Sequence, residues 1–292
     1  MTSIKDFQAL DGTIIRGYQP PSLDHAVPSS HPRLLADFQN RGELKKWAYS
    51  PLEMAEFLSI AHGKYIPSEE AKELISSPIP KTETREQFQD VMTTWAKVFD
   101  SWLFADSLHD SLGKLVFLED PEQPRAYFET DAVDGHEANT IFINLRSSSR
   151  EIGEWPEYKG TFEEFYIATL LHEMVHAFCN VYHCQKACCK EQTWHPSTGG
   201  IGCDGHGQPF SEGLKCLLDA LVAEGLAWAV DPIALGLGNS VVFSMFINLW
   251  QPEEKQLENW NVPIDKFGHV DAWYPLRQEA IADGEFDPTE YS

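Results

Sequence analysis

The residues best suited to chemistry form one short run, His172-Glu173-Met174-Val175-His176. In a helix, the i, i+4 spacing places both imidazoles on one face, close enough to bind the same metal ion. Glu173 would lie beside that ion without binding it, where its carboxylate can accept a proton from water. Two imidazoles on an otherwise apolar, buried helix each need a polar partner, and a single zinc ion can be the partner of both. The run therefore predicts a zinc site at His172 and His176.

A catalytic zinc ion takes three protein ligands and one water molecule, so a third ligand is expected elsewhere in the chain. His206 is favoured, because the flanking glycines in Gly205-His206-Gly207 let the backbone turn the imidazole toward the metal. Glu212 or Glu224 of the following helix would serve instead in a gluzincin-like site. A metzincin pattern is disfavoured, because the chain has Cys179 and Tyr182 where that pattern requires Gly and His, and His183 is one residue out of register. His195 is the candidate ranked lowest.

Three helices are expected to position these residues. The first covers residues 86–108 and carries a bulky apolar face at helical spacing. The second begins at Thr161, which forms a capping-box pattern with Glu164, and it contains the histidine pair within an apolar run that should be buried. The third covers residues 210–229 and follows a loop rich in cysteine, glycine and histidine. The apolar face of the first helix, at 86–108, consists of Phe88, Met92, Trp95, Val98, Phe99, Trp102 and Leu103.

Three short runs rich in β-branched and aromatic residues lie between the first two helices. They begin at Leu115, Ala126 and Thr140, and proline, glycine, aspartate and asparagine separate them. Such runs are typical of strands, and their short connections indicate a small antiparallel sheet. The predicted fold class is therefore α+β.

The segments LLHEMVHAF and GHGQPF resemble the motifs of the SprT-like zinc metalloproteases, the group that includes Spartan. The likeness covers about residues 86–225, and the cysteine-rich insertion before His206 is similar to fungal-type members. It implies a zincin-like core, with helices around the buried HExxH helix and a small antiparallel β-sheet. It also implies that His172, His176 and His206 bind one catalytic zinc ion and that Glu173 is the acid/base. The strand at 140–145 would then be the upper edge of the cleft, where an extended peptide pairs, or else an ordinary sheet strand.

The function expected from this resemblance is that of a zinc-dependent metalloendopeptidase acting on proteins or peptides. Glu173 would activate the water on the zinc ion and pass its proton to the leaving amine. Tyr166, Tyr182 and His183 are candidates for a second donor to the developing oxyanion. The alternatives are a zinc hydrolase or lyase acting on a small molecule, and a non-catalytic module that zinc stabilises.

The remaining cysteines fall into two groups. Cys179 and Cys216 lie on apolar helices and are expected in the core. The others lie in the loop between the histidines, where they could form disulfides, remain thiols or, less favourably, bind a second, structural zinc ion. The members of this loop cluster are Cys184, Cys188, Cys189 and Cys203.

Charge and composition narrow the range of partners. The 292 residues include 22 basic and 45 acidic side chains, for a net charge of −23, which makes nucleic acid an unlikely partner. The sequence contains no recognisable signal peptide and no uninterrupted apolar run long enough for a membrane span, so an intracellular protein without a membrane partner is expected. The expected organisation is an N-terminal extension (1–50), a SprT-like metalloprotease domain (51–235) and an acidic C-terminal extension (236–292). That last segment is either a solvated surface or a segment that packs on the core and selects basic peptides.

Overall fold

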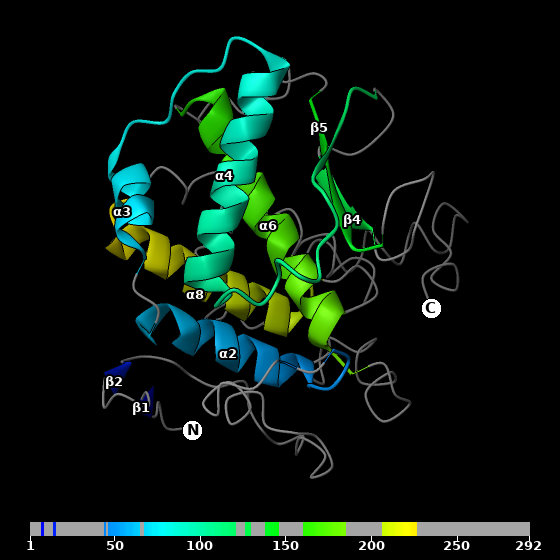
Figure 1. The fold of residues 1–292 in the computed structure, drawn as a ribbon. Helices are drawn as coiled ribbons and strands as arrows, with labels where there is room; N and C mark the ends of the chain where they lie inside the picture. Colours follow the sequence, from blue (N-terminus) through cyan, green and yellow to red (C-terminus); the bar gives the residue numbers. More distant parts are fainter. Residues whose placement is uncertain are drawn as a thin grey trace, which may run out of the picture.

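The computed structural model describes residues 7–8, 14–15, 44, 46–64, 67–120, 126–129, 138–145, 160–184 and 206–226. These residues form an α+β arrangement of helices beside a small sheet (Figure 1). The described helices are α2 (Pro51–Lys64), α3 (Glu69–Ser76), α4 (Arg85–Leu103), α6 (Phe162–Tyr182) and α8 (Gln208–Ala223). The described strands are β1 (Phe7–Gln8), β2 (Ile14–Ile15), β3 (Val116–Leu118), β4 (Ala126–Glu129) and β5 (Thr140–Asn144).

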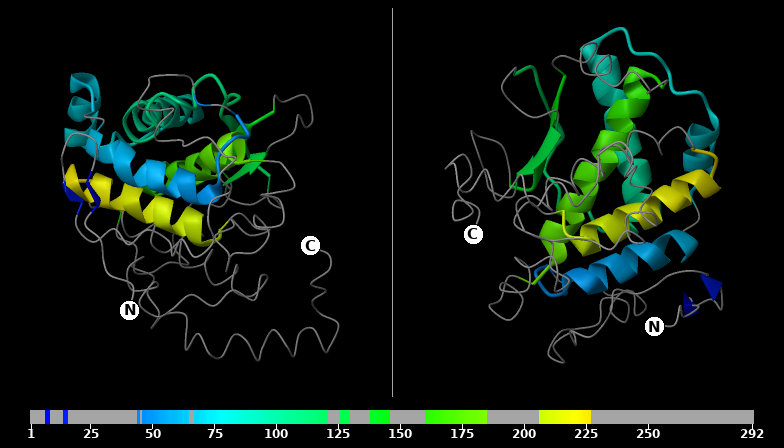
Figure 2. Two further views of the ribbon diagram at one scale, coloured as in Figure 1. Left: turned by 90° about the horizontal axis from the view of Figure 1, so that it is seen from below. Right: turned by 180° about the vertical axis from the view of Figure 1, so that it is seen from behind.

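Helix α6 occupies the centre of the fold. It begins as predicted: the Thr161 side chain accepts from the Glu164 N–H at 3.2 Å, and the Glu164 side chain accepts from the Thr161 N–H at 2.5 Å. This capping box satisfies two N–H groups that the first helical turn leaves without partners. Helices α2, α4 and α8 pack against α6, and β4 and β5 lie along it as well (Figure 2). The predicted burial of this helix is therefore confirmed.

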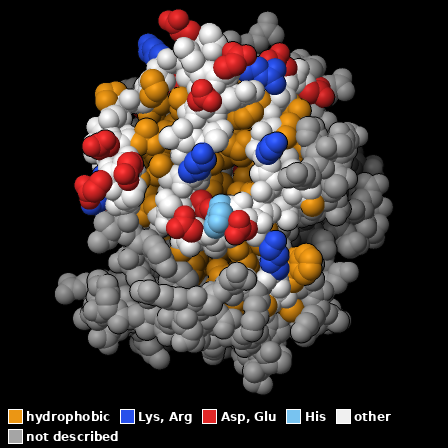
Figure 3. Space-filling view, in the orientation of Figure 1, with side chains coloured by type: hydrophobic (Ala, Val, Ile, Leu, Met, Phe, Trp, Pro, Cys, Tyr) orange, Lys and Arg blue, Asp and Glu red, His pale blue; other side chains and the backbone are white. Residues whose placement is uncertain are grey.

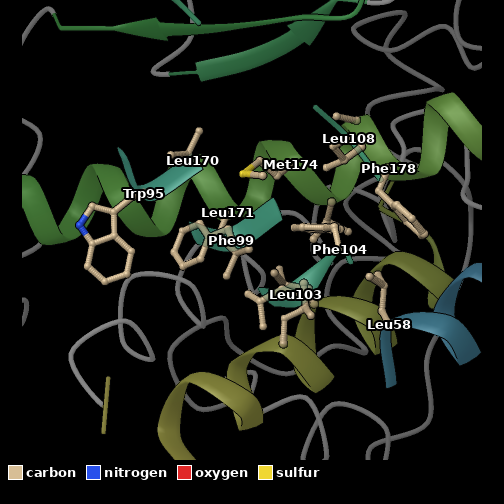
Figure 4. Close-up of a cluster of buried hydrophobic side chains, with 14 of the residues drawn as sticks. Leu58, Trp95, Phe99, Leu103, Phe104, Leu108, Leu170, Leu171, Met174 and Phe178 are labelled. Atoms are coloured by element: carbon tan, nitrogen blue, oxygen red, sulfur yellow. The ribbon is translucent and has the colours of Figure 1, made fainter. Parts of the chain in front are cut away.

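Apolar side chains from three helices meet around α6 (Figure 4). Leu58 of α2, Phe99 of α4, and Leu170, Met174 and Phe178 of α6 are each at most 1% exposed. Each such side chain contributes about 1.5–3 kcal/mol through its burial. Since α6 is enclosed by this core, its backbone offers a fixed support for the side chains on its remaining face.

Helices α2 and α8 lie side by side (Figure 2). They approach closely at Gly213 of α8, where an added Cβ would come within 2.8 Å of Leu58 Cδ1 and the Leu58 side chain would have to shift. Helix α8 also packs on α6. The two contacts fix the position of the chain where α8 begins.

The three-stranded sheet has the order β3-β5-β4. Strand β4 pairs with β5 in antiparallel fashion, with Tyr127 opposite Phe142, whereas β3 pairs with β5 in parallel, with Phe117 opposite Ile143. All three predicted strands are present, but the prediction of an antiparallel sheet is wrong, because β5 inserts between the other two. All five residues of β5 are buried, which favours the central position, since a neighbouring strand then covers each edge.

The central position of β5 also bears on whether this strand is the edge of a peptide-binding cleft or an ordinary sheet strand. Both of its edges are paired within the sheet, and the Leu145 N–H beyond its end donates to Leu118 O at 2.8 Å. An extended peptide cannot add to a strand whose two edges are already paired. Of the two alternatives, the structure therefore favours an ordinary sheet strand for Thr140–Asn144 over the edge of a peptide-binding cleft.

Helix α4 ends earlier than predicted, although its predicted apolar face is buried in full. The helix stops at Leu103, because Ala105 and Asp106 adopt φ values of 58° and 56° in the left-handed region. The turn is stabilised by the buried Asp100, whose Oδ1 accepts from the Leu108 N–H at 2.9 Å. This contact joins residues eight positions apart, which helical periodicity does not reveal.

The end of the expected N-terminal extension contacts helix α6. Residues 47–49 of the expected N-terminal extension donate backbone hydrogen bonds to Val181 and Tyr182 at the end of α6. Residues 236–292 lie outside the described residues.

On the face shown in Figure 3, the acidic and basic side chains of the described residues are interspersed among apolar ones. None of the described helices is both long enough and apolar enough to cross a membrane.

Candidate metal centre

Helix α6 presents His172 and His176 one turn apart on the same face. Their ring centroids are 5.0 Å apart, and their Nε2 atoms are separated by 3.2 Å. Both side chains are partly buried, whereas most of the helix around them is fully buried. The i, i+4 geometry predicted from the motif is therefore present, on a helix held by the core.

His206 completes a triangle of nitrogen atoms. It lies immediately before Gly207, the N-cap of α8, and its Nε2 atom is 3.2 Å from that of His172 and 3.0 Å from that of His176. The packing of α8 on α2 and α6 brings this residue to the histidine pair from 30 positions further along the chain. Within the described part of the chain, these three residues form the one group of three or more His, Cys, Asp or Glu side chains that could hold a metal ion.

The distances in this His triad, defined as His172, His176 and His206, fit a zinc ion. Zinc–nitrogen bonds of about 2.0–2.1 Å in a tetrahedral site place two ligand nitrogens about 3.3–3.4 Å apart. The observed separations of 3.0–3.2 Å are within about 0.4 Å of those values. Three imidazoles are also the donor set of known catalytic zinc sites, in which the fourth position is held by water or substrate.

The electrostatic environment favours the metal-binding form of the histidines. Burial lowers the pKa of His172 to about 3, and the neighbouring His206 adds to the shift. Burial likewise holds the pKa of His176 well below its ordinary value, with His206 and His172 as further causes. Both imidazoles are therefore neutral at pH 7, so each can offer a lone pair to a cation without first losing a proton.

Glu173 follows His172 directly and is 7% exposed. Burial raises the pKa of its carboxyl group to about 8. A cation bound beside it would favour the carboxylate and oppose this shift. Within the described residues, no other side chain forms a salt bridge or hydrogen bond with this carboxyl group. The group is thus available to exchange a proton.

The other candidate ligands among the described residues do not join the triad. Glu224 is the C-cap of α8, and the 16 residues of that helix separate it by about 24 Å from the end that carries His206. Glu212 lies on α8, but it is not part of the group whose ligand atoms converge. His195 lies outside the described residues. Among the described candidates, helix packing therefore brings His206 to the histidine pair.

The three candidates for an oxyanion donor have other partners. The Tyr166 hydroxyl donates to Asn144 O at 2.7 Å and ties α6 to the end of β5. The Tyr182 hydroxyl donates to the carbonyl oxygen of Ser107 in the turn after α4. His183 Nδ1 donates to Cys179 O at 3.1 Å. Each of these groups satisfies a backbone carbonyl, so the structure gives them a role in packing.

The described cysteines are not part of the group that could hold a metal ion. Burial raises the pKa of Cys179 and of Cys216 to about 12, which keeps both as unreactive thiols. Cys179 is 3% exposed and belongs to the core, as predicted. Cys184 is buried, and its N–H donates to Tyr49 O at 2.7 Å. The rest of the cysteine cluster in the loop lies outside the described residues.

Phe210 has a place in the site that the sequence analysis did not assign. It lies in the first turn of α8, four residues after His206, and it is 0% exposed. Its ring contacts the imidazoles of all three histidines. The signal in the sequence was the i, i+4 spacing between His206 and Phe210 at the start of a helix.

Comparisons of the chain with protein families, with curated proteins and with solved structures found no match. The described residues establish a mixed α+β fold that carries a His triad beside a buried glutamate.

Proposed function

We propose that this protein is a zinc-dependent metalloendopeptidase of the SprT-like type. In this proposal His172, His176 and His206 bind one zinc ion, and Glu173 is the acid/base. The observation that carries the proposal is the convergence of the Nε2 atoms of the His triad to within 3.0–3.2 Å of one another, with the buried Glu173 directly after the first of these histidines on α6.

The chemistry follows from the parts of the site. When bound, zinc supplies a Lewis acid that polarises a carbonyl group and lowers the pKa of water. Three neutral imidazoles leave the positive charge of the ion uncompensated, which strengthens both effects. The Glu173 carboxylate takes the proton from the attacking water and delivers it to the nitrogen of the leaving amine. The low exposure of Glu173 keeps bulk water from competing for that proton.

Two further observations support a catalytic rather than a structural centre. Structural zinc sites usually have four protein ligands, whereas the described residues bring three together here. A purely structural site also has no need of a carboxyl group adjacent to its ligands. The net charge of −23 favours proteins or peptides over nucleic acid as the substrate.

The proposal is tested by measuring zinc content and protein cleavage on the same samples. Zinc per chain is measured by mass spectrometry, and cleavage is followed on casein with and without a chelator. The variants are His206→Ala and, as a matched control, His109→Ala, which removes a histidine that has a 62% exposed side chain and is not part of the triad. We expect about one zinc ion per chain in the wild type and in His109→Ala, much less in His206→Ala, and chelator-sensitive cleavage.

The outcomes separate the parts of the proposal. Equal zinc content in His206→Ala would refute the assignment of the third ligand. Zinc binding without cleavage of an unfolded protein would refute the peptidase assignment and favour a small-molecule hydrolase.

A further inference from the structure

We propose that Phe210 is a positioning residue that holds the three imidazoles in their metal-binding orientation before the ion arrives. The inference rests on the proposed zinc site and deepens it. It concerns the affinity for the metal, which can be measured independently of peptidase activity.

The contacts of the Phe210 ring carry this inference. Its centroid lies 4.3 Å from that of His176, and an interplanar angle of 24° makes this a stacked pair. The imidazoles of His172 and His206 lie 5.0 Å and 4.9 Å away, at interplanar angles of 66° and 82°. A single phenyl ring is thus stacked on one imidazole and steeply inclined to the other two, and stacked and edge-to-face arrangements are those that aromatic pairs prefer.

The origin of the three histidines explains why such a contact is needed. Two of them belong to α6, whereas His206 precedes α8, so no single helix fixes their relative orientation. Rotation about χ2 of a histidine is soft, because terminal torsions of this type have broad minima. A phenyl ring packed against three imidazoles restricts those rotations together. Because it has no polar atom, it does this without competing for the nitrogen lone pairs.

The burial of Phe210 adds a second effect. The residue is 0% exposed, so its ring also excludes water from one side of the triad. A dry, apolar surround strengthens the attraction between a cation and its ligands. Hydrogen-bonded outer-shell partners change metal affinity by about 10–100-fold when they are removed, and we expect the loss of a ring that contacts all three imidazoles to reach the lower end of that range.

The test compares two leucine substitutions at buried phenylalanines. Phe210→Leu removes the ring from the triad, and Phe99→Leu removes an equally large ring from α4, where Phe99 is 1% exposed and contacts Trp95. Zinc affinity is measured by competition with a chromophoric chelator, at a temperature where circular dichroism shows each variant to be folded. The visible spectrum of the cobalt(II) form reports the coordination geometry.

We expect Phe210→Leu to bind zinc at least about tenfold more weakly than the wild type and to alter the cobalt spectrum. Phe99→Leu should lower the melting temperature and leave the zinc affinity and the cobalt(II) spectrum unchanged. Wild-type affinity and spectrum in Phe210→Leu, or equal losses in both variants, would overturn the inference. If Phe210→Leu does not fold, Phe210→Met replaces it, because the flexible thioether fills a similar volume without a ring.

Failure of this inference is distinguishable from failure of the proposed function. If wild-type protein binds no zinc, the metal site itself is refuted. If it binds zinc but cleaves no protein, only the peptidase assignment falls, and the affinity comparison still decides the role of Phe210.

Discussion

Removal of zinc is expected to lower the melting temperature of the protein, because the proposed ion joins two elements that are distant in the sequence. His172 and His206 are 34 residues apart, and folding brings their Nε2 atoms to 3.2 Å. The unfolded chain does not hold these ligands together, so the ion binds the folded state preferentially and stabilises it.

The size of the effect follows from mass action. Zinc at a free concentration of 100 times its Kd adds about 2.7 kcal/mol to the free energy of unfolding. For a chain of this length, each kcal/mol raises the melting temperature by about 2 °C, so the expected shift is about 5 °C. A further tenfold increase in free zinc should add about 1.4 kcal/mol, or about 3 °C.

The assay is differential scanning calorimetry of chelator-treated protein titrated with zinc. His109→Ala should show the wild-type shift, and His206→Ala should show a much smaller one, because one of the three ligands is missing. The reasoning is refuted if His206→Ala retains the full shift, or if the melting temperature does not change with zinc concentration.

Three further predictions concern single residues. Glu173→Gln should bind zinc as the wild type does and cleave casein about 10²–10⁴-fold more slowly, since the proton acceptor is lost; rapid cleavage would exclude Glu173 as the base. Tyr166→Phe should lower the free energy of unfolding, measured in urea, by about 1–3 kcal/mol, because the hydrogen bond to Asn144 O is lost. The kcat for casein should not change, and a large fall in kcat would instead support Tyr166 as an oxyanion donor. Burial raises the pKa of Asp100 in the folded state, so the wild type should lose stability relative to Asp100→Asn as the pH rises from about 4 through that raised pKa. Urea unfolding at several pH values measures this difference, and parallel pH profiles would contradict it.

Much of the candidate site could be predicted from the sequence. The HExxH spacing placed His172 and His176 on one helix face, and the capping box located the start of that helix at Thr161. These features depend on contacts within four residues along the chain, which spacing and residue type specify directly.

The third member of the triad was only partly predictable. The glycines around His206 favoured it, yet Glu212, Glu224 and His195 remained open as alternatives. The choice among the described candidates depends on how α8 packs against α2 and α6, including the close approach at Gly213. Such packing is decided by the fit of side chains from several helices, which one segment does not encode by itself.

The sequence by itself determined helices α4, α6 and α8, the existence of the three strands β3, β4 and β5, and the pair of histidines on α6, because hydrogen bonds and periodicity within short segments specify them. The tertiary structure alone decided that β3 pairs in parallel with β5, that α4 ends at Leu103, and that Phe210 lies against three imidazoles. Each of these features joins residues from separate segments. Their energies arise from burial and pairing across the whole core, so they become fixed only when the chain has folded.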